Sequence, residues 1–234
     1  MHPIIIIEYP SSEWIRNIII TIFLMMSYFL ISLKVKGDDL LLFLKLSGLS
    51  VLAMTLCNHV LLVESGSWEI SKDLPLHLCS ISALICCVIF FVKEKQFLFD
   101  FLFYAGIIGG ILSILTPQIT LYDQNYFYYV MFYFKHAAII IIPIVMMYRM
   151  KMKLSKHSWL KIFVVINILL AIIIPINSTL GSNFLYVAEP PNVSTPLIVE
   201  GKETILGLPV HVFYWEIILI ILVLLFYFCF RKKE

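Results

Sequence analysis

The sequence predicts an all-α fold: a polytopic helical membrane protein with about seven transmembrane helices. Of its 234 residues, 61% are apolar and only 14% are charged, against roughly a quarter charged in soluble domains. The mean hydropathy is +0.97, and the apolar residues gather in runs of about 20, the length that crosses a bilayer. A soluble globule of this size could not hide so much apolar surface. The composition therefore excludes a soluble enzyme, a disordered tail and a nucleic-acid-binding protein.

Seven stretches are long and apolar enough to span a membrane. They cover about residues 14–33, 40–63, 74–92, 97–116, 126–148, 159–177 and 212–230. The first run lacks a small-residue cleavage site, so we expect a retained span rather than a signal peptide. The connection 178–211 is rich in Gly and Pro, which favours a turn-rich outer cap over an eighth span. We expect residues 1–234 to form a single integral membrane domain.

The distribution of charge predicts the orientation, because cytoplasmic connections carry an excess of Lys and Arg. Basic residues concentrate in alternate connections and at the C-terminus: Lys34, Lys36, Lys93, Lys95, Arg149, Lys151, Lys153, Lys156, Arg231, Lys232 and Lys233. The other connections hold only Lys72 and Lys202 beside many acidic residues. The sequence therefore predicts a multi-pass protein of the cell membrane, with its N-terminus outside and its C-terminus in the cytoplasm.

The five cysteines do not form a recognisable framework. Cys57, Cys79, Cys86, Cys87 and Cys229 all lie within apolar runs. An odd number without loop spacing or a CxxC pair argues against disulfides and against a zinc site. The histidines show no i, i+4 pair and no HExxH run. We expect neither a metal nor a soluble cofactor.

Polar residues inside the predicted spans are the main functional clue, because ionisable groups in a membrane are costly unless they pair or face water. Most of them lie toward the predicted outer ends of the spans: Asn58, His59, His77, Asn177, Asn183 and Glu216. Lys135 and His136 lie near the middle of the fifth span. The clustering predicts a site in the outer half of the bilayer. The alternative to a functional role for His59 is a hydrogen bond between helices. The alternative for Glu216 is a carboxylate at the membrane interface without a functional role.

The third predicted span carries His77 and Cys79 near its start. Pro75 suits the first turn of a helix, which would place His77 in that turn. Cys79 would then point about 200° away from His77 around the helix. If Cys79 is a nucleophile, its base must come from another helix, with His136 or His59 as candidates.

Cys79 also has a purely structural interpretation. Cys79, Ser82 and Cys86 form a stripe of small residues at i, i+3 and i+7, and such stripes let membrane helices approach closely. Gly106 and Gly110 have the GxxxG spacing, which predicts close helix packing for the fourth span in the same way.

His136 is the strongest candidate for a functional role. Pro143, seven residues later, leaves a backbone carbonyl without its helical donor. The alternative is an inward histidine bonded to a neighbouring carbonyl. Lys135 would either extend to the interface or pair with Asp100 or Glu216.

Several of these segments together resemble a known family. The runs are LPLHLCSIS (74–82), FYAGIIGGILSILTP (103–117), FKHAAIIIIP with His136 and Pro143, and GSNFLY (181–186) after Asn177. They look like the bacterial YwaF-type integral membrane proteins, which are grouped with eukaryotic transmembrane protein 164, a phospholipid acyltransferase. The resemblance covers most of the chain and implies acyl transfer between lipids in a bacterial plasma membrane.

The resemblance also bears on individual residues. It implies functional roles for His77 and His136. In the eukaryotic motif a cysteine directly precedes the histidine that corresponds to His77, whereas Leu76 occupies that position here and the thiol is Cys79. Either Cys79 reaches the site through a distorted first turn, or the chemistry uses histidine without a thiol.

Three hypotheses for function follow. The first is a lipid acyltransferase or lipid-acyl hydrolase acting on a membrane lipid substrate. Its catalytic residues would be His77, His136 and Cys79, and its substrate-binding residues Asn58, His59, Asn177, Asn183 and Glu216, with the asparagines or backbone N–H groups stabilising an oxyanion. The second is a proton-coupled transporter that uses the same titratable groups. The third is a non-catalytic membrane scaffold.

Overall fold

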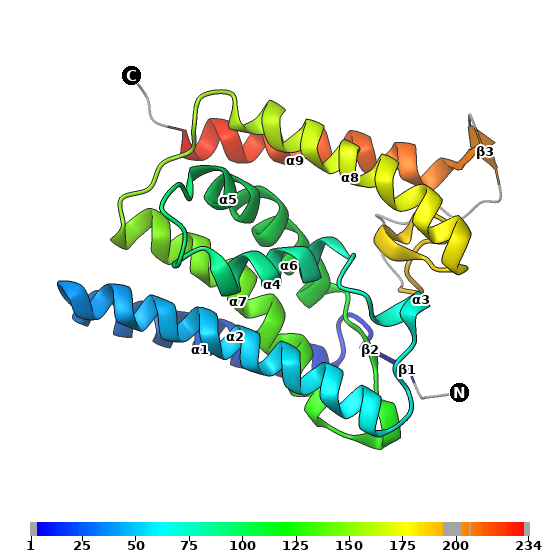
Figure 1. Cartoon of the computed structure of the whole chain (residues 1–234), viewed down its shortest axis with the longest axis horizontal. Helices are drawn as coiled ribbons and strands as arrows, with labels where there is room; N and C mark the ends of the chain where they lie inside the picture. The colour runs from blue at the N-terminus through cyan, green and yellow to red at the C-terminus, as the bar shows by residue number, and fades with distance from the viewer. Residues whose placement is uncertain (1–3, 194–202, 206, 232–234) are drawn as a thin grey trace.

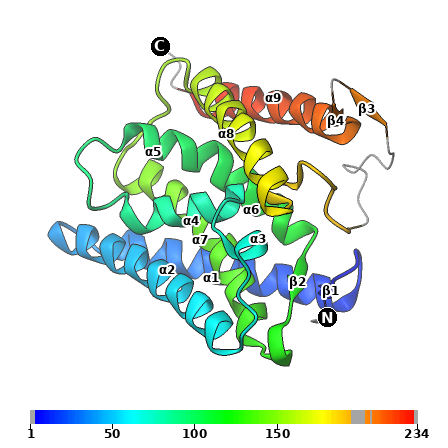
Figure 2. The same cartoon turned by 45° about the vertical axis from the view of Figure 1, so that its right-hand side comes forward.

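A computed structural model describes residues 4–193, 203–205 and 207–231 of the chain. The helices form three layers (Figures 1 and 2). One outer layer is the hairpin of α1 (Ser12–Lys34) and α2 (Asp38–Glu64), and the other is the pair α8 (Ser158–Leu180) and α9 (Val210–Phe230). The central layer contains α4 (Leu78–Val88), α5 (Gln96–Phe101), the π-helical turn η1 (Leu102–Gly106), α6 (Ile107–Leu115) and α7 (Phe127–Arg149).

The polytopic helical fold is confirmed. Six helical segments of the described chain are long and apolar enough to cross a membrane: α1, α2, the continuous run Gln96–Leu115, α7, α8 and α9. Their bounds differ from the predicted spans by only a few residues. The third predicted span differs most, because its helix α4 has only 11 residues. At about 1.5 Å per residue this helix alone covers about 16 Å of a hydrocarbon core of about 30 Å, and the extended residues before it supply part of the remaining length.

The polypeptide before α4 is extended rather than helical. The residue before a proline is disfavoured in helical conformation, and Leu74, which precedes Pro75, has a ψ of 137°. His77 is also extended, with a ψ of 146°, and is the N-cap of α4. The expectation that Pro75 and His77 lie in the first turn of a helix was therefore wrong. The helix begins at Leu78, which changes the direction of the His77 side chain.

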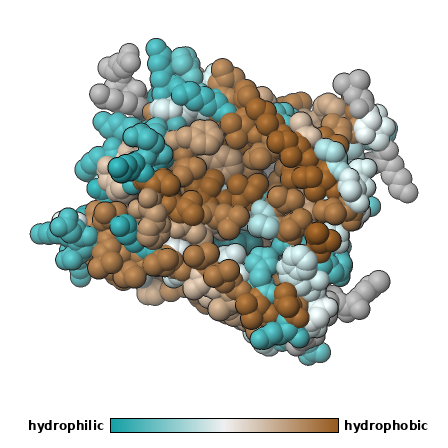
Figure 3. Space-filling view, viewed as in Figure 1, coloured by the Kyte–Doolittle hydropathy of each residue, from teal (hydrophilic) through white to brown (hydrophobic). Residues whose placement is uncertain are grey.

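The connections segregate to two ends of the molecule. Arg149 donates hydrogen bonds to the carbonyls of Leu33 (3.2 Å) and Val35 (2.5 Å), which joins two basic connections at one end. At the opposite end β1 (Ile4–Ile6) pairs with β2 (Gln118–Thr120), near the short helix α3 (Ile70–Asp73). We call the first the basic end, after the Lys and Arg residues of its connections, and the second the acidic end, after the Asp and Glu residues of the alternate connections. Figure 3 shows hydrophobic residues over the middle of one face and hydrophilic residues gathered toward its edges.

The GxxxG segment packs directly against α7, as predicted. A Cβ at Gly106 would lie 2.8 Å from the carbonyl oxygen of Ile139, and one at Gly110 would lie 2.7 Å from Ile140 Cγ1. Ile139 is four residues before Pro143, so its carbonyl lacks a helical N–H donor. Glycine lets the backbone of the central layer come close to this freed carbonyl. Within the described chain the run Gln96–Leu115 is the most buried of the six long segments.

The predicted outer cap 178–211 is described only in part. It contains the 3-10 turn η3 (Phe184–Tyr186) and the two-residue strands β3 (Thr204–Ile205) and β4 (Leu208–Pro209). Residues 194–202 and 206, with Lys202 among them, and the C-terminal Lys232 and Lys233 lie outside the described residues. The described part of the cap contains no membrane-spanning helix.

Candidate functional site

A cavity of about 470 Å³ lies between α4, α6, α7, α8, α9 and the loop that follows α8. Its walls are mostly apolar, with a limited set of polar side chains: His77, Cys79, Ser80, Tyr104, Ser113, Thr116, Gln118, Lys135, His136, Tyr186 and Glu216. We call it the histidine cavity. It brings together residues from five helices that are far apart in the sequence.

His77 and Cys79 both line this cavity. The angular argument that would separate them applies to two residues of one regular helix, and His77 lies before the helix. Its ring contacts the rings of Phe184 (5.5 Å between centroids) and Tyr186 (5.0 Å). Cys79 is the second residue of α4. The irregular start of α4 therefore lets the imidazole and the thiol reach the same space.

The Cys79 thiol lies against α6. Its Sγ is 3.5 Å from Ser113 Oγ, and a Cβ at Gly109 would lie 3.3 Å from the same sulfur. Gly109 is six residues before the end of α6, or about 9 Å at 1.5 Å per residue, so Cys79 lies toward the acidic end. The residues of the predicted small-residue stripe have different neighbours. Cys79 lines the cavity, whereas the backbone of Cys86 packs against Gly48 of α2.

His136 has one ring nitrogen engaged. Its Nδ1 is 2.7 Å from the carbonyl oxygen of Phe132. A carbonyl only accepts, so Nδ1 carries the hydrogen in the neutral ring and Nε2 keeps its lone pair. The ring is buried, with its centroid 4.3 Å from that of Phe132, and lines the cavity. The bond to a neighbouring carbonyl, expected as an alternative to function, thus leaves a basic nitrogen available.

Lys135 is partly buried and is an electrostatic neighbour of His77, Cys79 and His136. Among the described residues it forms no ion pair; the two ion pairs found there are Arg16–Glu13 and Lys72–Glu69. The predicted pairing with Asp100 does not occur, because that carboxylate accepts hydrogen bonds from Ser155 and Gln96. The cavity therefore holds a lysine amine without a carboxylate at salt-bridge distance among the described residues.

Glu216 also lines the cavity but is engaged by a residue that the sequence did not single out. Asn167 of α8 donates from its Nδ2 to Glu216 Oε2 (3.0 Å) and to the carbonyl of Phe163 (3.0 Å). Asn167 lies in a run of apolar residues, and a lone amide in a membrane span was the available signal.

Asn177 and Asn183 do not line the cavity; they shape the loop that closes it. Asn177 donates to the carbonyl of Phe184 (2.9 Å) and accepts from the Phe184 N–H (2.9 Å). Asn183 accepts from the N–H groups of Ala188 (2.9 Å) and Glu189 (3.2 Å). Since both amide oxygens are occupied within the loop, these residues support the walls rather than an oxyanion.

His211 is the residue that sequence reasoning missed. It is buried in the first turn of α9, and its Nε2 is 2.8 Å from the carbonyl oxygen of Tyr186. This bond ties α9 to the loop whose Leu185 and Tyr186 have positive φ values of 58° and 54°. The seventh predicted span, 212–230, leaves His211 just outside it; its place four residues before Trp215, whose ring centroid lies 5.1 Å from that of His211, was the overlooked signal.

The sequence matches the TMEM164 family over residues 9–227. The chain belongs to the TMEM164 family. No curated protein and no solved structure matches the chain at a significant level. The TMEM164 match runs from before α1 almost to the end of α9, so it covers every wall of the histidine cavity.

Asn58 and His59 lie away from the histidine cavity of this TMEM164-family protein. His59 Nδ1 accepts a hydrogen bond from Trp68 Nε1 (3.2 Å) at the end of α2. The nearby Asp73, outside the spans, has its pKa raised by burial, while the Glu69 N–H and the charge of His59 oppose the rise. The structure brings neither Asn58 nor His59 to the other candidate residues. The described chain also contains no group of three His, Cys, Asp or Glu side chains that could hold a metal ion.

Proposed function

We propose that this TMEM164-family protein is a membrane lipid acyltransferase in which Cys79 carries the acyl group and His136 moves the proton. The observation that carries the proposal is the shared cavity. A thiol, two imidazoles and a cation without a carboxylate partner line one mostly apolar space. Buried polar groups of this kind are costly unless they have a role.

The chemistry begins with the transfer of the Cys79 thiol proton to His136 Nε2, the nitrogen left free by the bond from Nδ1 to Phe132. The thiolate adds to the carbonyl of a lipid ester, and the tetrahedral intermediate collapses to a thioester on Cys79. The leaving lipid alcohol takes the proton from the imidazolium. The hydroxyl of a second lipid then attacks the thioester, gives its proton to His136, and the thiol is restored.

Two features of the cavity support stabilisation of the negative charge that develops. Lys135 is an electrostatic neighbour of Cys79. The N–H groups of Leu78 and Cys79 belong to the first turn of α4, where backbone donors have no intrahelical acceptor. Such fixed donors and charges in a water-poor space are the usual means of stabilising an oxyanion.

The walls support a lipid substrate. Leu112, Ile166, Leu170, Leu219 and Leu222 line the cavity beside the reactive groups. A predominantly apolar pocket of a few hundred Å³ with few polar groups suits a ligand that is mostly hydrocarbon.

The proposal is tested by trapping the thioester. The purified protein in lipid nanodiscs is incubated with a phospholipid that carries a labelled acyl chain, and hydroxylamine-sensitive label on Cys79 is measured by peptide mass spectrometry. We expect label on Cys79 and none in Cys79→Ser. Cys57→Ser and Cys229→Ser are matched controls, because both residues are exposed and outside the cavity wall. Transfer that persists in Cys79→Ser would refute the thioester route.

The proposed orientation puts the acidic end, and hence the cavity, on the exterior side of the cell membrane. The excess of basic residues in the connections at the opposite end supports this. A reporter that is active only in the cytoplasm, fused after the last residue, is expected to be active. Silence of that fusion would reverse the orientation.

The position of Glu216 in the cavity wall supports a second candidate function, that of a proton-coupled carrier. Its carboxylate lines the same cavity as the two imidazoles, and chains of carboxylate and histidine groups also serve proton relays. Proton-coupled uptake into vesicles that is lost in Glu216→Gln, without thioester formation in the parent protein, would select this function over acyl transfer.

A further inference from the structure

A second cavity of about 480 Å³ lies on the other side of α7, between α1, α2 and α7. None of the residues that line it lines the histidine cavity. Most of its wall is apolar, from residues such as Leu24 and Met25 of α1, Val51 of α2 and Ala137 and Ile141 of α7. We call it the tyrosine groove, after Tyr28, Tyr129 and Tyr133 in its wall.

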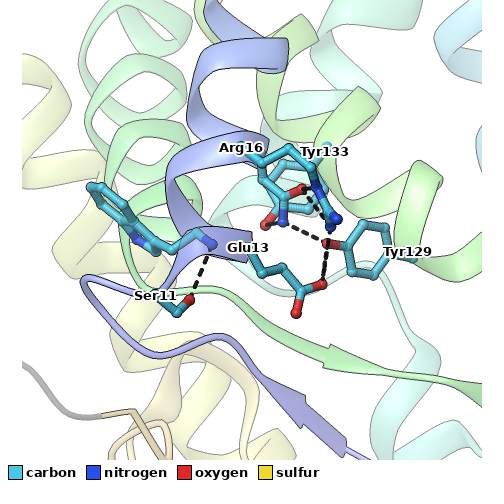
Figure 4. Close-up of polar contacts among 7 residues, drawn as sticks. Ser11, Glu13, Arg16, Tyr129 and Tyr133 are labelled. Atoms are coloured by element: carbon cyan, nitrogen blue, oxygen red, sulfur yellow. Dashed lines mark hydrogen bonds and ion pairs between the residues drawn. The ribbon is translucent and has the colours of Figure 1, made fainter.

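One end of the tyrosine groove has a polar cluster from α1 and α7 (Figure 4). Asn17 donates to the hydroxyls of Tyr129 (2.5 Å) and Tyr133 (3.0 Å). Tyr129 in turn donates to the Glu13 carboxylate (2.8 Å), and Arg16 lies 3.4 Å from the same carboxylate. Asn17 and Tyr129, which line the groove, thus connect it to an anionic and a cationic group that lie side by side just outside its wall.

The charged pair is available to a ligand. The Arg16 and Glu13 side chains are 60% and 46% exposed, and their separation of 3.4 Å is long for an ion pair. Arg16 also donates to Asn17 Oδ1 (3.4 Å), and Glu13 accepts from Tyr129, so the network holds both charges in place while each keeps an exposed edge for a partner of complementary sign.

The apolar part of the groove is open to the bilayer. Ile20, Leu24 and Val130 line it and are all more than 45% exposed, and they lie on helices that cross the membrane. The wall of α1 runs from Asn17 to Tyr28, a length of about 16 Å at 1.5 Å per residue. The polar cluster lies in the first turns of α1, a helix long enough to cross a membrane, so we infer that the groove runs from the headgroup region toward the hydrocarbon core.

We propose that the tyrosine groove is a binding site for a zwitterionic phospholipid, distinct from the histidine cavity. The lipid phosphate contacts Arg16, its positively charged headgroup contacts Glu13, and one acyl chain lies along α1 and α7. The arrangement of charges favours a zwitterionic lipid over an anionic one. The Arg16 guanidinium and the Glu13 carboxylate complement the two charges of a zwitterion, whereas the carboxylate repels an anionic headgroup.

The test uses the full chain in nanodiscs that contain a photoactivatable phosphatidylethanolamine or a photoactivatable phosphatidylglycerol with the same acyl chains. Labelled peptides are mapped by mass spectrometry. We expect phosphatidylethanolamine to label the α1 and α7 peptides. In Glu13→Gln and in Arg16→Gln this labelling is expected to fall by about tenfold, as for loss of one charged contact. Ala137→Leu, which fills the groove, is expected to reduce it as well.

The matched control is Lys72→Gln. Lys72 and Glu69 form the other i, i+3 ion pair, with side-chain exposures of 61% and 51%, away from the groove. This variant should be labelled like the parent protein, and all variants should retain its elution profile. Three outcomes would overturn the proposal: equal labelling by phosphatidylglycerol, unchanged labelling in the groove variants, or occupancy of this face by a second copy of the chain, detected as a crosslink between chains.

Discussion

The two faces of α7 differ in how their polar groups are satisfied. On the face toward α1, Asn17, Tyr129 and Tyr133 hydrogen-bond to one another. On the face toward α4 and α6, Lys135 forms no ion pair within the described chain, and His136 has one ring nitrogen bonded only to its own helix. One helix thus presents a satisfied network to one cavity and reactive groups to the other.

Satisfied and unsatisfied polar groups have different consequences in an apolar protein. A satisfied polar network stabilises helix packing and gives a ligand a fixed surface. A buried basic group without a partner costs free energy, and it is retained where a charge or a lone pair is used. On this basis we propose ligand binding for the tyrosine groove and bond formation for the histidine cavity.

The largest effect expected is that of His136→Ala. Loss of the general base should lower acyl transfer by about 10²–10⁴-fold, as measured with labelled phospholipid in nanodiscs. Tyr133→Phe is the matched control and should retain activity, because Tyr133 lies three residues earlier on α7 but lines the tyrosine groove rather than the histidine cavity. Equal losses in the two variants would remove the distinction between the faces.

Lys135 is expected to matter next. Lys135→Met should reduce acyl transfer by about 100-fold, because a fixed charge near the developing oxyanion is lost. Lys135→Arg retains the charge and should recover part of the rate. A Met variant as active as the parent would show that the charge has no part in the reaction, whatever its nearness to Cys79.

Gly109 and Gly110 are adjacent residues of α6 with different surroundings, so substitutions there separate an effect on the Cys79 thiol from an effect on helix packing. A Cβ at Gly109 meets only Cys79 Sγ at 3.3 Å, whereas one at Gly110 meets Ile140 and the carbonyl of His136. Gly109→Ala should displace the sulfur and lower activity by about tenfold with little loss of stability. Gly110→Ala should destabilise the protein by about 1–3 kcal/mol. Thermal unfolding in detergent and acyl transfer, measured on both variants, separate these effects.

The smallest effect expected is that of Tyr133→Phe on stability. It removes one hydrogen bond of Asn17, whose Nδ2 keeps Tyr129 as a partner, so the free energy of unfolding should fall by about 1 kcal/mol. Chemical unfolding of the parent and the variant measures it. A much larger loss would mean that the tyrosine network carries the packing of α1 on α7 by itself.

Particular residues show how far the sequence could predict this site. His77, His136 and Glu216 stand out as costly polar groups in a membrane span, Cys79 was added by its place near His77 and by the family resemblance, and all four line the histidine cavity. Asn177 and Asn183 were chosen for the same reason but are engaged within the loop. The cost of burying a polar group identifies it as important without telling whether its partner is a ligand or its own backbone.

The amino-acid sequence alone was sufficient to predict the six long apolar helices, because the length and apolar character of a span are local properties set by the thickness of the bilayer. It also determined the close approach of Gly106 and Gly110, because small side chains permit such contact wherever they occur. Long-range contacts in the folded chain were needed to show that His77 contacts Tyr186, that Asn167 engages Glu216, and that His211 holds Tyr186. These outcomes depend on groups tens of residues apart meeting in space, and no local pattern encodes such a meeting.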